Sequence, residues 1–146
     1  MEKSFFNFNK QILAGEAGAW VSAPLIAWIV SRFTGVAATI SAYAVIGSII
    51  GGSGVWLAMR VHDRKAQHAY SFKNLATDVA YFTPVAFIFT ALVYYPVLFF
   101  LSEKLILGDH YIIVSVLVSQ FIAFSLFFML LNAYRYFLKK FTGKAL

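Results

Sequence analysis

The sequence contains no cysteine and few charged residues. The absence of cysteine excludes disulfide bonds and thiolate metal sites. Charged residues make up 12% of the 146 residues, whereas 61% are hydrophobic and 18% aromatic. Because a soluble domain usually carries about 25% charged residues, this composition excludes an ordinary soluble fold and indicates an integral membrane protein.

The few charges that are present are concentrated in one stretch. Six charged residues lie between Met59 and Asp78, and the sequence on either side is almost uncharged and strongly apolar. A charge near the centre of a bilayer costs about 3 kcal/mol on insertion scales. We therefore expect this stretch to be a water-exposed connection between two membrane-embedded helical hairpins.

Long apolar runs predict four membrane-spanning helices, at residues 12–33, 37–59, 73–101 and 110–134, with a cytoplasmic loop at 60–72. A span needs about 20 apolar residues. The first run is full length and leads directly into the next, which favours a span over a signal peptide. The expected fold class is an all-α membrane protein of one domain, residues 1–146. It is a bundle of four transmembrane helices built from two hairpins that repeat in parallel orientation.

The basic residues predict the orientation of this bundle. Of the 12 Lys and Arg residues, only Arg32 and Lys104 fall at the outer ends of the predicted spans. By the positive-inside rule, both termini and the central loop are expected to be cytoplasmic in a multi-pass protein of the cell membrane. This topology also explains the net charge of +6, so we expect no nucleic-acid partner.

Small residues at four-residue spacing predict where the helices pack closely, because such residues let two backbones approach. The second span carries a GxxxG motif, and the first and fourth spans each have a face of small residues. The residues expected at helix–helix contacts are Gly18, Gly47, Gly51, Gly54 and Ser119.

Two acids occupy matching positions in the two hairpins. Glu16 and Asp78 each lie about one turn into an odd-numbered span, and Arg60 and Arg135 close the two hairpins. The repeat predicts that these four residues lie at one depth, near the cytoplasmic boundary. An acid there must be paired or face water. Either the acids line a vestibule and attract a cationic group or exchange protons, or each forms a static ion pair with an arginine or reaches the interface.

Further candidates follow from the surroundings of Asp78. Tyr81 adds a hydroxyl group, and Pro84 and Pro96 should kink the third span and free backbone carbonyls. Asn132 is expected to form a hydrogen bond between helices. The candidates for substrate contact or coupling are Asp78, Glu16, Tyr81, Pro84, Arg60, Arg135 and Asn132.

No catalytic motif is present, so we expect neither an enzyme nor a cofactor. His62, Asp63 and His68 lie in the predicted charged loop without the spacing of a metal site. We expect these side chains to be solvated and to bind no metal.

The segment from Lys73 to Tyr81 resembles the AlaE-type alanine exporters, small bacterial proteins with four spans. Those exporters carry a similar lysine-asparagine-leucine-alanine stretch, with an aspartate and a tyrosine entering the third span. The resemblance implies proton-driven export of a small amino acid and a role for Asp78. Glu16 stands where those exporters have an aspartate.

Two other segments resemble the GtrA-like four-span membrane proteins, which are linked to polyprenyl-phosphate sugar transfer. These segments are Ile12 to Gly15 and the asparagine-arginine-aromatic cluster from Leu131 to Phe137. The second span lacks the asparagine of that family. This resemblance implies a carrier of lipid-linked sugars in which Arg60 and Arg135 contact a diphosphate.

The first functional hypothesis is therefore a small membrane transporter that exports an amino acid or a similar metabolite, with proton coupling as one option. Because four helices enclose little volume, a transport path is expected to need a homo-oligomer. The alternatives are an accessory subunit of a larger membrane complex and the carrier of polyprenyl-phosphate-linked sugars. The lipid bilayer is the first partner expected, with other membrane subunits and a small-molecule substrate as further possibilities.

Overall fold

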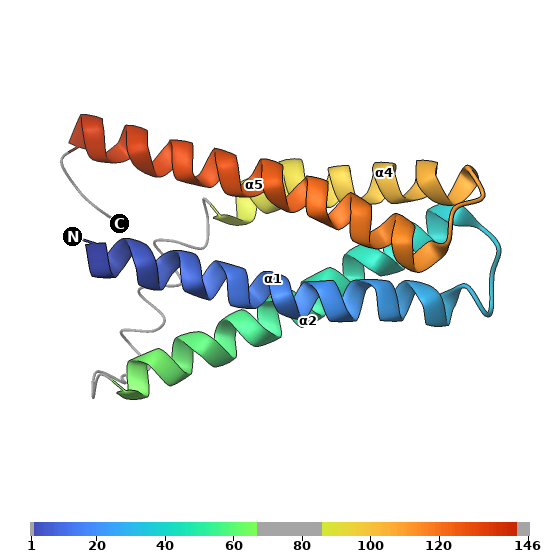
Figure 1. Ribbon diagram of the computed structural model, residues 1–146, viewed down its shortest axis with the longest axis horizontal. Helices are drawn as coiled ribbons and strands as arrows, with labels where there is room; N and C mark the ends of the chain where they lie inside the picture. Colours follow the sequence, from blue (N-terminus) through green and yellow to red (C-terminus); the bar gives the residue numbers. More distant parts are fainter. Residues whose placement is uncertain (1, 67–85, 143–146) are drawn as a thin grey trace.

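The computed structural model describes residues 2–66 and 86–142, and all regular structure in these ranges is helical (Figure 1). The helices are α1 (Glu2–Val30), α2 (Ala37–Ala66), the π-helix η1 (Thr90–Tyr94), α4 (Tyr95–Leu107) and α5 (Ile112–Thr142). Residues 86–89 are also helical, so the described part of the third span is one continuous helix from residue 86 to residue 107.

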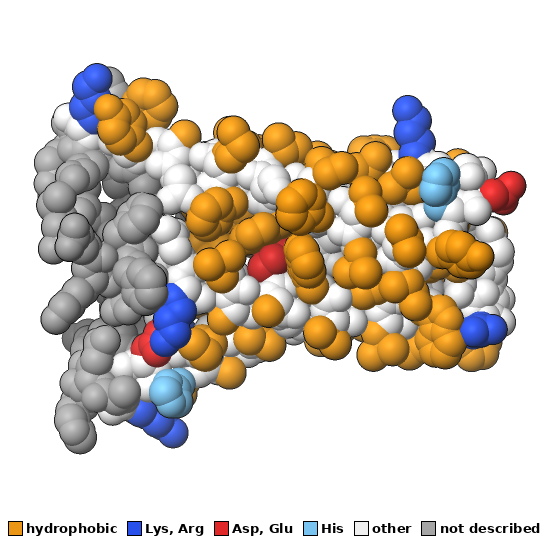
Figure 2. All heavy atoms as spheres, in the orientation of Figure 1, with side chains coloured by type: hydrophobic (Ala, Val, Ile, Leu, Met, Phe, Trp, Pro, Cys, Tyr) orange, Lys and Arg blue, Asp and Glu red, His pale blue; other side chains and the backbone are white. Residues whose placement is uncertain are grey.

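Four helical stretches are long and apolar enough to cross a membrane: Asn9–Val30, Ala37–Asp63, Ala86–Leu107 and Ile112–Tyr134. Each has at least 22 residues, which at about 1.5 Å per residue exceeds the roughly 30 Å of bilayer hydrocarbon. The outer surface between their ends is largely hydrophobic (Figure 2). The prediction of an all-α, multi-pass membrane protein in a lipid bilayer is confirmed at this level.

The helices form a ring in which each has two principal neighbours. Helix α1 packs on α2 and α5, and α4 packs on the same two helices from the other side. The N-terminal end of α1 and the C-terminal end of α5 lie at one end of the bundle, and the connections 31–36 and 108–111 lie at the other (Figure 1). That the end with the termini is cytoplasmic, and that the two hairpins form a repeat, stay predictions.

Every long helix extends further at one end than the apolar runs predict. Helix α1 begins at Glu2 instead of residue 12, and α5 continues to Thr142 instead of ending at residue 134. Helix α2 continues to Ala66, so residues 60–66 of the predicted loop are helical, and α4 continues to Leu107 instead of ending at residue 101. Residues 67–85, which include the rest of that loop and the start of the third span, lie outside the described residues. Hydropathy locates the membrane-embedded part of a helix, whereas arginine and lysine are good helix formers that extend it beyond the membrane.

Helices α1 and α2 share the most extensive contact of the described structure. A side chain at Gly47 would meet the backbone of α1, with its Cβ only 2.8 Å from the Ser22 carbonyl oxygen. Gly18 and Gly51 lie against each other's backbone in the same contact. The Ser22 hydroxyl donates to the Gly47 carbonyl at 2.7 Å, and so bonds the two helices directly. Gly54 has no neighbouring atom within 4 Å of its would-be Cβ and lies outside this contact.

The third span contains a wider helical turn directly before a proline. The Tyr95 backbone N–H donates to the Thr90 carbonyl, five residues back, and Pro96 follows in the first turn of α4. Proline has no N–H for the usual helical bond, and the π-helix ends where that donor is missing. Tyr94, the last residue of η1, is buried in the bundle with only 4% of its surface exposed.

Candidate binding cavity

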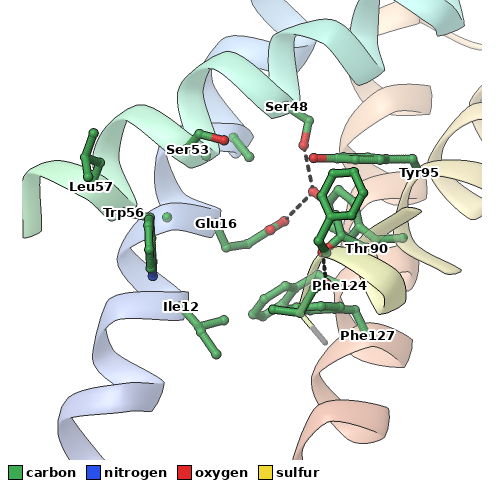
Figure 3. Close-up of a pocket in the computed structure, with 16 residues that line it drawn as sticks. Ile12, Glu16, Ser48, Ser53, Trp56, Leu57, Thr90, Tyr95, Phe124 and Phe127 are labelled. Carbon is green, nitrogen blue, oxygen red and sulfur yellow. Dashed lines mark hydrogen bonds between the residues drawn. The ribbon is translucent and has the colours of Figure 1, made fainter. Parts of the chain in front are cut away.

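A cavity of about 380 Å³ lies among α1, α2, η1 and α5 (Figure 3). Its lining is largely apolar, with Glu16 as the only charged residue among the described residues that line it. The aromatic side chains that line it are Trp56, Phe87, Tyr94, Tyr95, Phe124 and Phe127. Ligand pockets commonly have volumes of about 300–1,000 Å³, an apolar lining and a few polar groups, and this cavity has all three properties.

The polar centre of the cavity is a chain of hydrogen bonds that joins three helical segments. Trp20 Nε1 donates to Glu16 Oε1 at 2.7 Å, and the Tyr94 hydroxyl donates to the same oxygen at 3.1 Å. The Ser48 hydroxyl in turn donates to the Tyr94 hydroxyl at 3.1 Å. Figure 3 shows the Glu16 side chain extending from α1 towards this chain, with Ser48 above it on α2. We call Glu16, Trp20, Ser48 and Tyr94 the Glu16 cluster.

Local structure explains why these side chains meet. Glu16 and Trp20 are four residues apart and therefore share one face of α1. Gly15 and Gly52 lie in the contact between α1 and α2, where a Cβ at Gly15 would be 3.1 Å from the Gly52 carbonyl oxygen. This close approach brings Ser48 of α2 near the same face. Tyr94 arrives from the opposite side of the bundle, at the end of the π-helix.

The Glu16 carboxylate has no ion-pair partner among the described residues, and both of its hydrogen-bond donors are neutral side chains. Both donors reach Oε1, so Oε2 accepts no hydrogen bond from the described residues. Figure 2 shows an acidic side chain recessed among hydrophobic ones in the middle of the bundle, between α1 and α5. An acid within a span is costly unless it is paired or faces water, so this carboxylate is the main candidate for a functional group in the cavity.

Gln120 of α5 lies next to this centre. Its amide is close enough to interact with the Glu16 carboxyl group and the Tyr94 hydroxyl. The side chain is completely buried, yet neither its nitrogen nor its oxygen makes a hydrogen bond within the described structure. An amide in this position can pair with a water molecule or adjust its orientation when the Glu16 cluster changes.

A second polar cluster lies nearer the end of the bundle. Gln11 bridges two charged residues of α2: Arg60 Nη1 donates to Gln11 Oε1 at 2.8 Å, and Gln11 Nε2 donates to Asp63 Oδ2 at 2.8 Å. Lys10 Nζ lies 3.7 Å from Asp63 Oδ1. We call Lys10, Gln11, Arg60 and Asp63 the Gln11 cluster. Unlike the Glu16 cluster, it contains charges of both signs.

The predicted site residues are therefore only partly brought together. Glu16 lines the cavity, but Arg60 of α2 lies in the Gln11 cluster. Gln11 precedes Glu16 by five residues on α1, which corresponds to about 7.5 Å at the rise of an α-helix. The expected single depth for Glu16 and Arg60 does not hold. The reason is that the second span ends at the level of Gln11, so its basic end cannot reach deeper into the bundle. Asp78, Tyr81 and Pro84 lie outside the described residues, as does the side chain of Arg135.

The remaining candidates make their polar contacts within their own helix, and Asn132 Oδ1 is buried without a hydrogen-bond partner in the described structure. Asn132 Nδ2 donates to the Phe128 carbonyl at 2.9 Å, not to another helix as expected, because a carbonyl four residues earlier is always within reach of such a side chain. Ser119 is completely buried at the helix contact, and its hydroxyl donates to the Ser115 carbonyl at 2.6 Å. The His62 side chain is largely exposed, and its Nδ1 lies 3.8 Å from Asp63 Oδ1.

Sequence reasoning did not include Trp20, Ser48 or Tyr94 among the site residues. For Trp20 a signal was present, because its spacing of four residues from Glu16 places both on one helix face. For Tyr94 the sequence carried no comparable signal, since it meets Glu16 across a separation of 78 residues. In comparisons with protein-family models, curated proteins and solved structures, no match to this chain was found.

Proposed function

We propose that this protein is a small membrane transporter that exports a small metabolite, and that Glu16 contacts the substrate or carries the coupling proton. The observation that carries this proposal is a carboxylate that has no ion-pair partner among the described residues and lies in a cavity within the membrane-spanning part of the bundle. Intramembrane ionisable residues most often mark substrate, ion or proton pathways.

The cavity supports transport better than a purely structural role for Glu16. A structural acid would be expected to have a basic partner, as Asp63 has in the Gln11 cluster. Within the described part of the chain, Glu16 has only neutral donors, and they leave Oε2 available to a ligand. The cavity volume of about 380 Å³ suits a small organic molecule.

The orientation, location and assembly are part of the same proposal. The basic residues favour cytoplasmic termini in the cell membrane, and the matched positions in the two hairpins favour a parallel repeat. A homo-oligomer would supply the path that four helices alone are too few to enclose. In this arrangement the protein acts without larger subunits.

The proposal is tested by transport in proteoliposomes under an imposed pH gradient. Purified protein is reconstituted, and the efflux of labelled amino acids and amines is measured for the wild type, Glu16→Gln and Glu103→Gln. The Glu103 variant is the matched control, because it removes a carboxylate of α4 that does not line the cavity. We expect Glu16→Gln to abolish transport and Glu103→Gln to retain it.

Two results would count against the proposal. One is full transport by Glu16→Gln, which would remove Glu16 from the pathway. The other is stoichiometric copurification of larger membrane subunits in mild detergent, which would favour an accessory subunit. A monodisperse homo-oligomer is the result that we expect.

A further inference from the structure

We propose that the cavity selects small organic cations, in particular amines attached to an apolar or aromatic group, over zwitterionic amino acids. This inference names the substrate class for Glu16 and so rests on the proposed function. It is carried by the charge and the chemistry of the side chains that line the cavity.

The first argument is the charge of the lining. Glu16 is the only charged side chain among the described residues around the cavity, and no lysine, arginine or histidine joins it there. An ammonium group can pair with the free Oε2 of this carboxylate. The carboxylate of an amino acid would have no basic partner among these residues and would lie near a like charge, which opposes binding.

The second argument is the aromatic content of the lining. Trp56 of α2, Tyr94 and Tyr95 of the third span, and Phe124 and Phe127 of α5 surround the cavity from three helices. Aromatic faces attract cations within about 6 Å of the ring centre and also provide apolar contact. A cation with an aromatic or aliphatic substituent uses both properties, whereas a small polar zwitterion such as alanine uses neither well.

The third argument is the rigidity of the carboxylate. Trp20 and Tyr94 both donate to Oε1 and fix its position, and Ser48 fixes the Tyr94 hydroxyl. Oε2 then has a defined position from which it can bind a ligand. A group that is held before the ligand arrives loses less entropy on binding.

Three probes that share one phenyl group test the inference: phenethylamine (a cation), 2-phenylethanol (neutral) and phenylalanine (a zwitterion). Binding to the purified protein in nanodiscs is measured by titration calorimetry and by tryptophan fluorescence, since Trp56 lines the cavity. We expect phenethylamine to bind at least tenfold more tightly than either other probe. Glu16→Gln should remove this advantage, whereas Glu103→Gln should keep it.

The outcomes separate this inference from the proposed function. Phenylalanine binding as tightly as phenethylamine, or an unchanged preference in Glu16→Gln, would overturn the substrate class, even if Glu16-dependent transport of another metabolite were observed. Glu16-dependent binding of phenethylamine supports the substrate class, and its transport in proteoliposomes is then measured separately. Binding of phenethylamine without any transport would support the proposed cation site and contradict the proposed transport function.

Discussion

Helix α1 contributes to two polar clusters, centred on Gln11 and Glu16, five residues apart. The two clusters differ in how their acidic side chain is stabilised near the membrane. In the Gln11 cluster, the positive charges of Lys10 and Arg60 lie around the negative charge of Asp63. In the Glu16 cluster, the hydrogen-bond donors to the one negative charge are all neutral among the residues that the structure describes. Asp63 is therefore paired with a basic residue of the protein, whereas the Glu16 cluster has capacity for a cationic ligand.

The comparison teaches that partial burial of a charged side chain does not by itself identify a functional site. Asp63 and Glu16 both accept hydrogen bonds from side chains of other residues, with donor–acceptor distances between 2.7 and 3.1 Å. What separates them is the charge of their partners and the space beside them. Only Glu16 lines the cavity.

The largest effect on stability is expected from a substitution that disrupts the contact between α1 and α2, because both clusters contain residues of these two helices. Gly51 lies in the close contact between α1 and α2, and a methyl group there would collide with Ser22 and the backbone of Gly18. We expect Gly51→Ala to lower the free energy of unfolding by about 2 kcal/mol and to weaken phenethylamine binding. Thermal unfolding in detergent, followed by circular dichroism, measures the change.

Gly54→Ala is the control for this prediction. It makes the same substitution on the same helix, at a position with no neighbouring atom within 4 Å. The helix propensity of alanine should make this variant as stable as the wild type, or more stable by up to about 1 kcal/mol. Equal losses of stability in the two variants would contradict the described contact between α1 and α2.

A smaller effect is expected within the Glu16 cluster. Tyr94→Phe removes one donor to Glu16 and leaves the buried Ser48 hydroxyl without its acceptor. We expect a loss of about 1–2 kcal/mol of stability and a severalfold weaker binding of phenethylamine, measured by the same titration. Tyr95→Phe is the matched control, because the Tyr95 hydroxyl makes no hydrogen bond among the described residues although its ring lines the cavity. Identical behaviour of the two variants would remove Tyr94 from the cluster.

The smallest effect is expected in the Gln11 cluster. Asp63→Asn keeps an acceptor for Gln11 but removes the ion pair with Lys10, whose side chain is 48% exposed. A pair of this kind contributes about 1 kcal/mol or less and is weakened by salt. We therefore expect a small loss of stability that disappears at high salt, with unchanged ligand binding. A large loss of binding would mean that the two clusters are coupled.

The sequence predicted the four spans because apolar length follows directly from bilayer thickness. It singled out Glu16 for the same reason, since an acid in an apolar run is exceptional. It did not predict the partners of that acid. The repeat suggested Arg60 or Arg135, whereas one observed partner, Tyr94, comes from a helix far along the chain. Asn132 shows a related difficulty, because an amide that can bond across helices can equally bond within its own helix.

The π-helix changes the helical register of the third span. A π-turn holds one more residue than an α-turn, so the side chains before Thr90 are rotated by about 100° relative to the positions that one uninterrupted α-helix would give them. The third span therefore has two phases joined at η1, and no single helical wheel describes it. Deleting one residue within Thr90–Tyr94 would restore one phase and turn the start of this helix to a different face. The length of η1, and not only its composition, determines which side chains the third span presents to Glu16.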